Sequence, residues 1–81
     1  MDIRVRFFAS VRERLGCSEA TCTLADGATV RDLLDQLCRN HPSLVEVRHV
    51  LSIAVNREYV DSDNRLSDND EVALIPPVSG G

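Results

Sequence analysis

The C-terminal end of this sequence carries the group that is best placed to do chemistry. The chain closes with Pro76-Pro77-Val78-Ser79-Gly80-Gly81. Adjacent prolines prevent a strand from continuing and stiffen the exit, while the terminal glycines leave the last carboxylate unhindered. Fully extended, such a tail reaches about 20 Å, which is enough to enter another protein's active site. We predict that Gly81 is the reactive residue and that Gly80 gives it access; the alternative is a frayed end without function.

The size and charge of the chain exclude several other classes of function. With 81 residues and 43% hydrophobic content, it has room for one compact core and no second domain. The net charge of −4 supplies no basic footprint for phosphates, so we expect no nucleic-acid partner. No apolar run approaches the length of a membrane span, and the N-terminus does not resemble a signal peptide. We therefore expect a cytoplasmic protein with no membrane partner.

The residue types found in the body of the chain do not suggest an enzyme that acts alone. All 9 basic residues are arginine, so the chain has no Schiff-base lysine and no lysine for a P-loop. An acidic stretch that starts at Asp61 begins like a calcium loop, but Leu66 replaces the glycine of its turn and Val72 replaces its last ligand. We expect this chain to bind no metal and no cofactor.

The cysteines are expected to be reduced thiols, because 3 cysteines cannot all pair and the chain has no export signal. Cys22 falls in an alternating strand pattern and Cys38 on the apolar side of a helix. Both are predicted to be small core residues. Cys17, next to Gly16, is the thiol that we expect to be exposed.

Apolar residues that alternate with polar ones predict the strands. The clearest case is residues 2–8, where Ile3, Val5 and Phe7 form the buried side. Further strands are predicted around residues 20–24, 51–55, 59–60 and 72–74.

Helical spacing and capping residues predict the helices. The stronger one starts at Thr29, which can form a capping box with Asp32, and ends before Pro42. A shorter one is predicted over residues 11–15, capped by Ser10 with Glu13. Residues 43–50 remain open between a short helix and a loop.

This order of elements predicts an α+β domain of the β-grasp, or ubiquitin-like, type, in which one mixed sheet packs on one main helix. We assign residues 1–75 to this domain and residues 76–81 to an extended tail. Strand alternation places some side chains on the outer face of the sheet, away from the helix. We predict a partner-binding patch there and along the tail, made by Phe8, Arg12, Tyr59, Ile75, Pro76, Pro77 and Val78.

Four segments of the chain together carry a resemblance to a known family: Val5-Arg6-Phe7-Phe8-Ala9 with Arg12-Glu13, Ala54-Val55-Asn56, residues 66–73 and the tail from Pro76 to Gly81. They resemble the small-subunit family of molybdopterin synthase, the MoaD family of sulfur carriers. The resemblance covers essentially the whole chain, and the tail is its most specific part. One departure is Asn69, at which the family usually has glycine, but asparagine also tolerates a left-handed backbone.

The resemblance implies a defined chemical cycle. The Gly81 carboxylate would be adenylated by an activating enzyme that uses ATP, and a sulfur donor would convert it to a thiocarboxylate. A large catalytic subunit, in a heterotetramer with this chain, would then use that sulfur to build the dithiolene of molybdopterin from cyclic pyranopterin monophosphate. By this resemblance the chain is not catalytic alone and is the sulfur-donating subunit of a heteromeric sulfurtransferase.

Three alternatives remain open from the sequence. The chain could carry sulfur for another pathway, such as thiazole synthesis, cysteine synthesis or transfer-RNA thiolation. It could be a ubiquitin-like modifier that is conjugated through Gly81 to lysines of other proteins. It could also be an interaction domain whose tail is inert.

Overall fold

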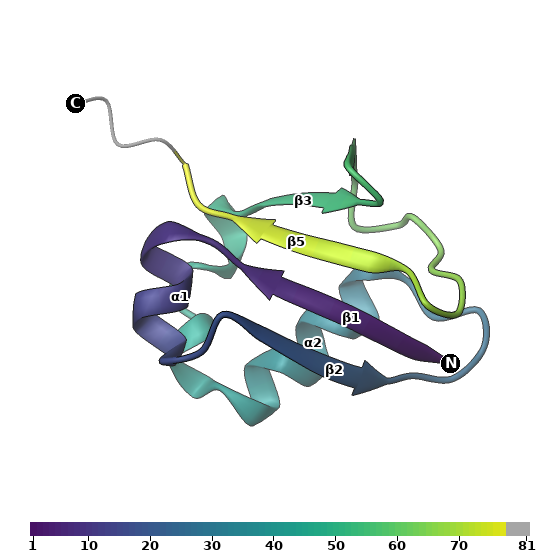
Figure 1. The fold of residues 1–81 in the computed structure, drawn as a ribbon, viewed down its shortest axis with the longest axis horizontal. Helices are drawn as coiled ribbons and strands as arrows, with labels where there is room; N and C mark the ends of the chain where they lie inside the picture. Colours follow the sequence, from purple (N-terminus) through teal and green to yellow (C-terminus); the bar gives the residue numbers. More distant parts are fainter. Residues whose placement is uncertain (78–81) are drawn as a thin grey trace.

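The computed structural model describes residues 1–77, and Figure 1 shows how its elements are arranged. The strands are β1 (Asp2–Phe7), β2 (Glu19–Thr23), β3 (Ser52–Val55), β4 (Glu58–Val60) and β5 (Glu71–Ile75). The helices are α1 (Ala9–Leu15) and α2 (Val30–Asn40), with short 3-10 turns η1 (Pro42–Leu44) and η2 (Arg48–Val50). The segment left open between helix and loop is therefore made of these two turns.

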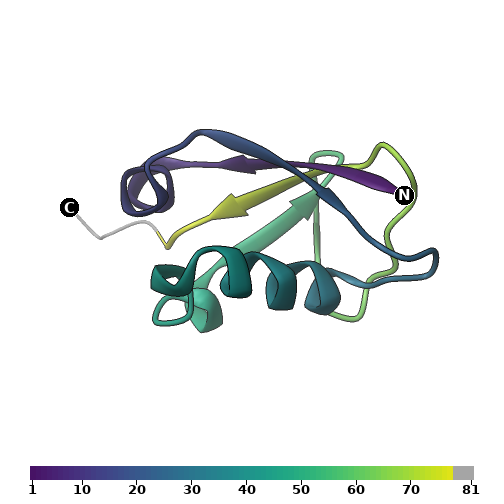
Figure 2. The same cartoon turned by 90° about the horizontal axis from the view of Figure 1, so that it is seen from below.

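The five strands form one mixed sheet in the order β2-β1-β5-β3-β4. The central strands β1 and β5 are parallel, and the other neighbours pair antiparallel. The α2 helix packs across one face of this sheet and leaves the opposite face open (Figure 2). This arrangement is the predicted β-grasp fold.

The core lies between the sheet and α2. Strand alternation buries Ile3, Val5 and Phe7 on the helix side, each at most 2% exposed. The apolar stripe of α2 meets them with buried side chains of Val30, Leu33, Leu34 and Leu37. At about 25 cal/mol per Å² of apolar area removed from water, burial of this inner face is a large favourable contribution to folding. The outer face is free for other uses.

The predicted capping box of α2 is confirmed. The Asp32 backbone N–H donates to the Thr29 hydroxyl at 3.4 Å, and the Thr29 backbone N–H donates to the Asp32 carboxylate at 2.9 Å. The predicted cap of α1 at Ser10 is wrong, because this helix begins at Ala9 and Phe8 is its N-cap without a side-chain bond. The Phe8 carbonyl accepts the Val11 N–H at 3.0 Å, so the chain turns directly from β1 into α1.

Two expectations about exposed positions need correction. The first strand ends at Phe7, so Phe8 lies after β1 and its exposure follows from the strand-to-helix turn and not from strand alternation. Cys17 is half-buried, because it packs against the edge of the core; Cys38 is also half-buried there, and Cys22 is buried as predicted. Among the described residues, no helix has both the length and the apolar character needed to cross a membrane.

Candidate functional site: an apolar hollow beside the tail

The tail leaves the sheet at the end of β5. Because β1 and β5 are parallel and Phe7 pairs with Leu74, the last residues of β5 lie beside the turn that holds Phe8. The Phe8 N–H donates to the Leu74 carbonyl at 3.3 Å and fixes this junction. Pro76 is half-buried and Pro77 is exposed. Val78, Gly80 and Gly81 lie outside the described residues.

The register of the sheet places one row of residues across its open face. Arg6 of β1 pairs with Ala73 of β5, Ala73 pairs with Ala54 of β3, and Ala54 pairs with Tyr59 of β4. The two alanines stand in the centre of this row, and larger side chains stand at its ends. Small residues between large ones create a depression in a surface that would otherwise be flat.

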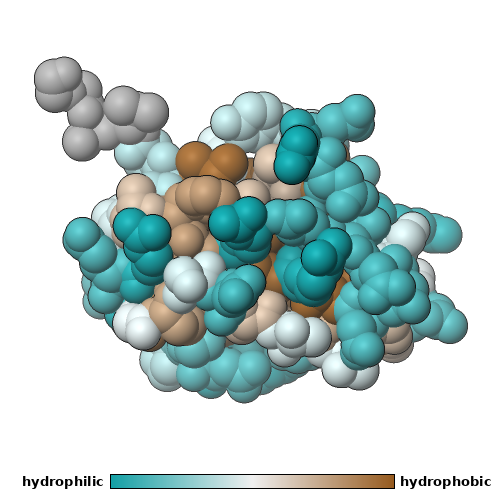
Figure 3. All heavy atoms as spheres, viewed as in Figure 1, coloured by the Kyte–Doolittle hydropathy of each residue, from teal (hydrophilic) through white to brown (hydrophobic). Residues whose placement is uncertain are grey.

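This depression, which we call the sheet-face hollow, has a volume of about 350 Å³. It is lined by Arg6, Phe8, Ala54, Arg57, Tyr59, Glu71, Ala73 and Ile75. Figure 3 shows the apolar surface on this face near the end of β5, where the chain leaves the sheet. An apolar floor of this size suits a side chain of a partner protein.

The rim of the sheet-face hollow carries charge, and part of that charge is already paired. The Arg6 guanidinium lies 3.3 Å from the Glu71 carboxylate and 5.5 Å from the centre of the Phe8 ring. Arg6 thereby holds the Phe8 ring in place through a cation–π contact. Phe8 is 38% exposed and Tyr59 is 73% exposed, so both rings present apolar surface to solvent.

The structure brings together three of the predicted patch residues, Phe8, Tyr59 and Ile75, in the sheet-face hollow. Arg12 is exposed on α1 and does not line this hollow. Pro76 and Pro77 line a smaller hollow of about 170 Å³ between α1 and η2. The sequence patterns predicted these positions separately, and their role in binding remains a prediction.

Sequence reasoning missed Ala54, Arg57 and Glu71 as members of the site. Ala54 is 6% exposed although it points to the outer face, because the larger side chains around it cover so small a residue. A signal that could have found it is cross-strand pairing, since Ala54 is opposite both Ala73 and Tyr59. Arg57 lies in the tight turn between β3 and β4, where its backbone φ is 73°, and from this turn it lines the hollow.

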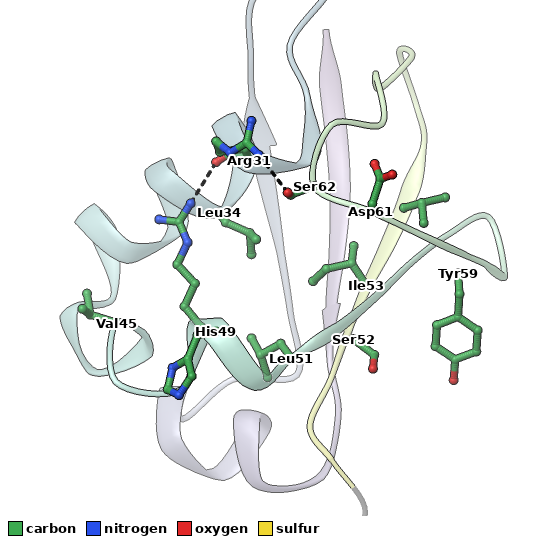
Figure 4. Close-up of a pocket in the computed structure, with 12 residues that line it drawn as sticks. Arg31, Leu34, Val45, His49, Leu51, Ser52, Ile53, Tyr59, Asp61 and Ser62 are labelled. Atoms are coloured by element: carbon green, nitrogen blue, oxygen red, sulfur yellow. Dashed lines mark hydrogen bonds between the residues drawn. The ribbon is translucent and has the colours of Figure 1, made fainter.

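A larger hollow of about 630 Å³ lies between α2, η2 and the edge formed by β3 and β4 (Figure 4). Both of its arginines are bonded within the fold. Arg31 donates to the Ser62 hydroxyl at 3.1 Å and pairs with Asp63 at 2.7 Å, while Arg48 donates to the Arg31 carbonyl at 3.4 Å. A second bond, from Arg48 to Asp35 at 2.6 Å, raises the pKa of the guanidinium. The Arg31 bonds fasten the loop after β4 to α2 and the Arg48 bonds fasten η2 to α2, so we infer that this region serves stability.

The topology and the open sheet face define the class: a ubiquitin-like β-grasp domain. A model of the ThiS family matches residues 5–81, and the chain belongs to this family. It is 47% identical over 83 residues to a molybdopterin synthase sulfur carrier subunit of Chlamydomonas reinhardtii, with all of both chains covered. It is 42% identical over 86 residues to the subunit of that name from Escherichia coli, with 98% of this chain and 99% of the relative covered. These relatives confirm the resemblance found in the sequence.

Solved structures agree with this assignment. A putative molybdopterin converting factor subunit 1 from Pyrococcus furiosus superposes with a TM-score of 0.87 at 34% identity, over 96% of this chain and 99% of that one. SAMP1 from Haloferax volcanii gives a TM-score of 0.89 at 30% identity, with both chains fully covered. A complex of subunits 1 and 2 of molybdopterin-converting factor from Helicobacter pylori gives 0.72 at 28% identity, again with full coverage.

Proposed function

We propose that this chain is the sulfur carrier subunit of a molybdopterin synthase and that the Gly81 carboxylate carries the sulfur. The observation that carries the proposal is the position of the sheet-face hollow, directly beside the point at which the Gly-Gly tail leaves the sheet. A partner that grips the hollow would receive the tail in its own active site. Relatives that match over the full chain carry the same functional name.

The chemistry requires activation before sulfur can enter. A carboxylate is a poor electrophile because its oxygen is a poor leaving group. Adenylation with ATP converts Gly81 to an acyl adenylate and releases pyrophosphate; a sulfur nucleophile then displaces AMP and leaves a thiocarboxylate. We propose that an activating enzyme and a sulfur donor supply these steps, and that the thiocarboxylate donates its sulfur to cyclic pyranopterin monophosphate.

The proposed partner is the large subunit of the synthase, in a heterotetramer. The Helicobacter pylori structure contains subunit 1 bound to subunit 2, and its subunit 1 resembles this chain. In the proposed complex, an apolar side chain of the large subunit fills the sheet-face hollow over Ala73. Phe8, Tyr59 and Ile75 surround that side chain, while Arg12, Pro76, Pro77 and Val78 contact the partner along the path of the tail.

Intact-mass analysis tests the proposal. The purified chain is incubated with ATP, an activating enzyme from a molybdopterin pathway and a sulfide donor. We expect a mass increase equal to the exchange of one oxygen for one sulfur, located on Gly81 by fragmentation. A chain that keeps its original mass, under conditions that charge the Escherichia coli carrier, would contradict the proposal.

A second candidate function is protein modification. The full-length similarity to SAMP1, a small archaeal modifier protein, supports it. A modifier would form an amide between Gly81 and a lysine of another protein. A sulfur carrier would instead remain a free chain that ends in a thiocarboxylate. Tagged chain purified from cells therefore separates the two: conjugates that survive reducing denaturation would favour modification.

A further inference from the structure

The chain has almost no amine that could attack its own activated C-terminus. The 81 residues contain no lysine, since all 9 basic residues other than histidine are arginine. Arginine keeps its proton at neutral pH, and a protonated guanidinium has no lone pair with which to attack an acyl group. The α-amino group of Met1 is therefore the one primary amine in this sequence.

The Met1 amine is engaged in the fold. It donates to the Leu24 carbonyl at 2.8 Å, and it lies 4.0 Å from the Asp26 carboxylate. The Leu24 N–H in turn donates to the Met1 carbonyl at 2.9 Å, so Met1 is tied to the end of β2 in both directions. The Met1 side chain is 3% exposed. An attacking amine must lose its proton and its hydrogen bond and must rotate towards the acyl group, and this arrangement opposes each step.

The N-terminus also lies at the opposite end of the sheet from the last residue of β5 (Figure 1). Because β1 and β5 are parallel with Phe7 opposite Leu74, the length of β1 separates Met1 from the end of β5. At about 3.3 Å per residue that separation is roughly 20 Å. Pro77 lies beyond the end of β5, beside Ser10 in the hollow between α1 and η2, so it is no closer to Met1 than that strand end. The residues after Pro77 can span at most about 14 Å when fully extended. The C-terminus thus cannot reach the Met1 amine of its own chain without unfolding.

Amide formation at Gly81 would inactivate a carrier irreversibly. An acyl adenylate or thioester at Gly81 reacts with a lysine amine to give an amide, with loss of AMP or thiol and a proton. That amide is not an acyl donor under mild conditions, so the carrier would be consumed. A thioester to a cysteine would remain reactive, and Cys22 is in any case buried, which raises the pKa of its thiol.

We propose that this chain acts as an acyl donor and not as an acyl acceptor: it contains no lysine and its fold engages the Met1 amine, so that its activated C-terminus reacts with other molecules in preference to a copy of itself. This inference rests on the proposed activation of Gly81. For the modifier alternative it has a direct consequence. A chain without an acceptor amine can be attached to a target protein as single units but cannot be linked into polymers.

A chemically prepared thioester tests the inference without any activating enzyme, so its outcome is independent of the proposed sulfur pathway. The full chain is released from an intein fusion with a thiol to give a Gly81 thioester, and it is incubated at 10 µM and mildly alkaline pH. Two variants receive one lysine each at exposed positions. Ser10→Lys places the amine in the hollow that Pro76 and Pro77 line, and Ala25→Lys places it near Met1.

We expect the wild-type thioester to hydrolyse to monomer without forming an amide. Ser10→Lys should cyclise at a rate that does not depend on protein concentration, because a short tether gives a millimolar effective concentration, roughly hundred-fold above 10 µM. Ala25→Lys should form amide-linked dimers whose rate rises with concentration. A wild-type chain that forms amides as fast as Ala25→Lys would overturn the inference.

Acetylation of the wild-type chain by an N-hydroxysuccinimide ester provides a second measurement. We expect the Met1 amine to react at least three-fold more slowly in the native chain than in guanidinium-unfolded chain at the same pH. Equal rates would show that the fold does not protect this amine and would overturn its part of the inference.

Discussion

Two adjacent phenylalanines allow the fold and the proposed interface to be tested separately. Phe7 is 2% exposed and points into the core, whereas Phe8 is 38% exposed and lines the sheet-face hollow. We expect Phe7→Ala to lose about 3–5 kcal/mol of unfolding free energy, because the truncation leaves a cavity in the core. For a domain of this length the total is only roughly 4–12 kcal/mol, so the variant will be marginally folded.

Phe8→Ala should cost much less stability. Its ring is partly in solvent and makes one cation–π contact, with Arg6 at 5.5 Å. Partial burial and that contact together account for about 1–2 kcal/mol. Because we place the ring at the centre of the proposed interface, its loss should also weaken binding to the large subunit by about 2 kcal/mol, or roughly thirty-fold in Kd.

Guanidinium unfolding followed by circular dichroism gives the first quantity, and calorimetric titration with a molybdopterin synthase large subunit gives the second. Thr21→Ala is the matched control, since Thr21 is exposed on β2 outside the hollow. It should change neither quantity by more than about 0.5 kcal/mol. Loss of stability in Phe8→Ala equal to that in Phe7→Ala would refute the assignment of Phe8 to the outer face. Normal binding by Phe8→Ala would refute the proposed interface.

Three further predictions concern the tail, the hollow and a buried thiol. Deleting Gly81, or adding one residue after it, should abolish sulfur transfer in a reconstituted synthase assay while Tm stays within about 2 °C, because chain ends contribute little to stability. Ala73→Leu should fill the hollow and reduce large-subunit binding at least ten-fold in a titration, whereas Thr21→Leu, which lies outside the hollow, should bind normally. The raised pKa of Cys22 means that the unfolded chain loses its thiol proton first. Stability should therefore fall as pH rises above about 8.5, and Cys22→Ala should show a shallower decline in alkaline urea unfolding.

Much of the fold could be predicted from the sequence, because alternation and capping are local signals. Ile3, Val5 and Phe7 alternate with arginine and aromatic residues, and the strand that they form is buried on the expected side. Thr29 and Asp32 stand at the spacing of a capping box and form one. Ser10 showed a similar spacing with Glu13, but a backbone carbonyl at the strand-to-helix junction begins that helix instead.

The site was predictable only in part, because it depends on register. Local alternation indicates which side of a strand faces outward, and it placed Ile75 correctly. It does not indicate which residues of two strands stand opposite each other. The depression exists because Ala54 pairs with Ala73, and these residues are far apart in the sequence. The role of the tail, in contrast, is predicted from residue types alone, since the proposed chemistry depends on covalent structure; it stays a prediction.

The alanines at the centre of the open face are themselves an argument for a partner. Alanine is less favourable in strands than valine, isoleucine or threonine, and a pair of alanines opposite each other forgoes the side-chain contacts that stabilise a sheet. Larger residues at Ala54 and Ala73 would cover more of the outer face and add stability, but they would remove the hollow between Phe8 and Tyr59. A domain of this size has little stability to give up. Its retention of a depression beside the tail is therefore best explained by a partner whose side chain completes the packing that this chain leaves open.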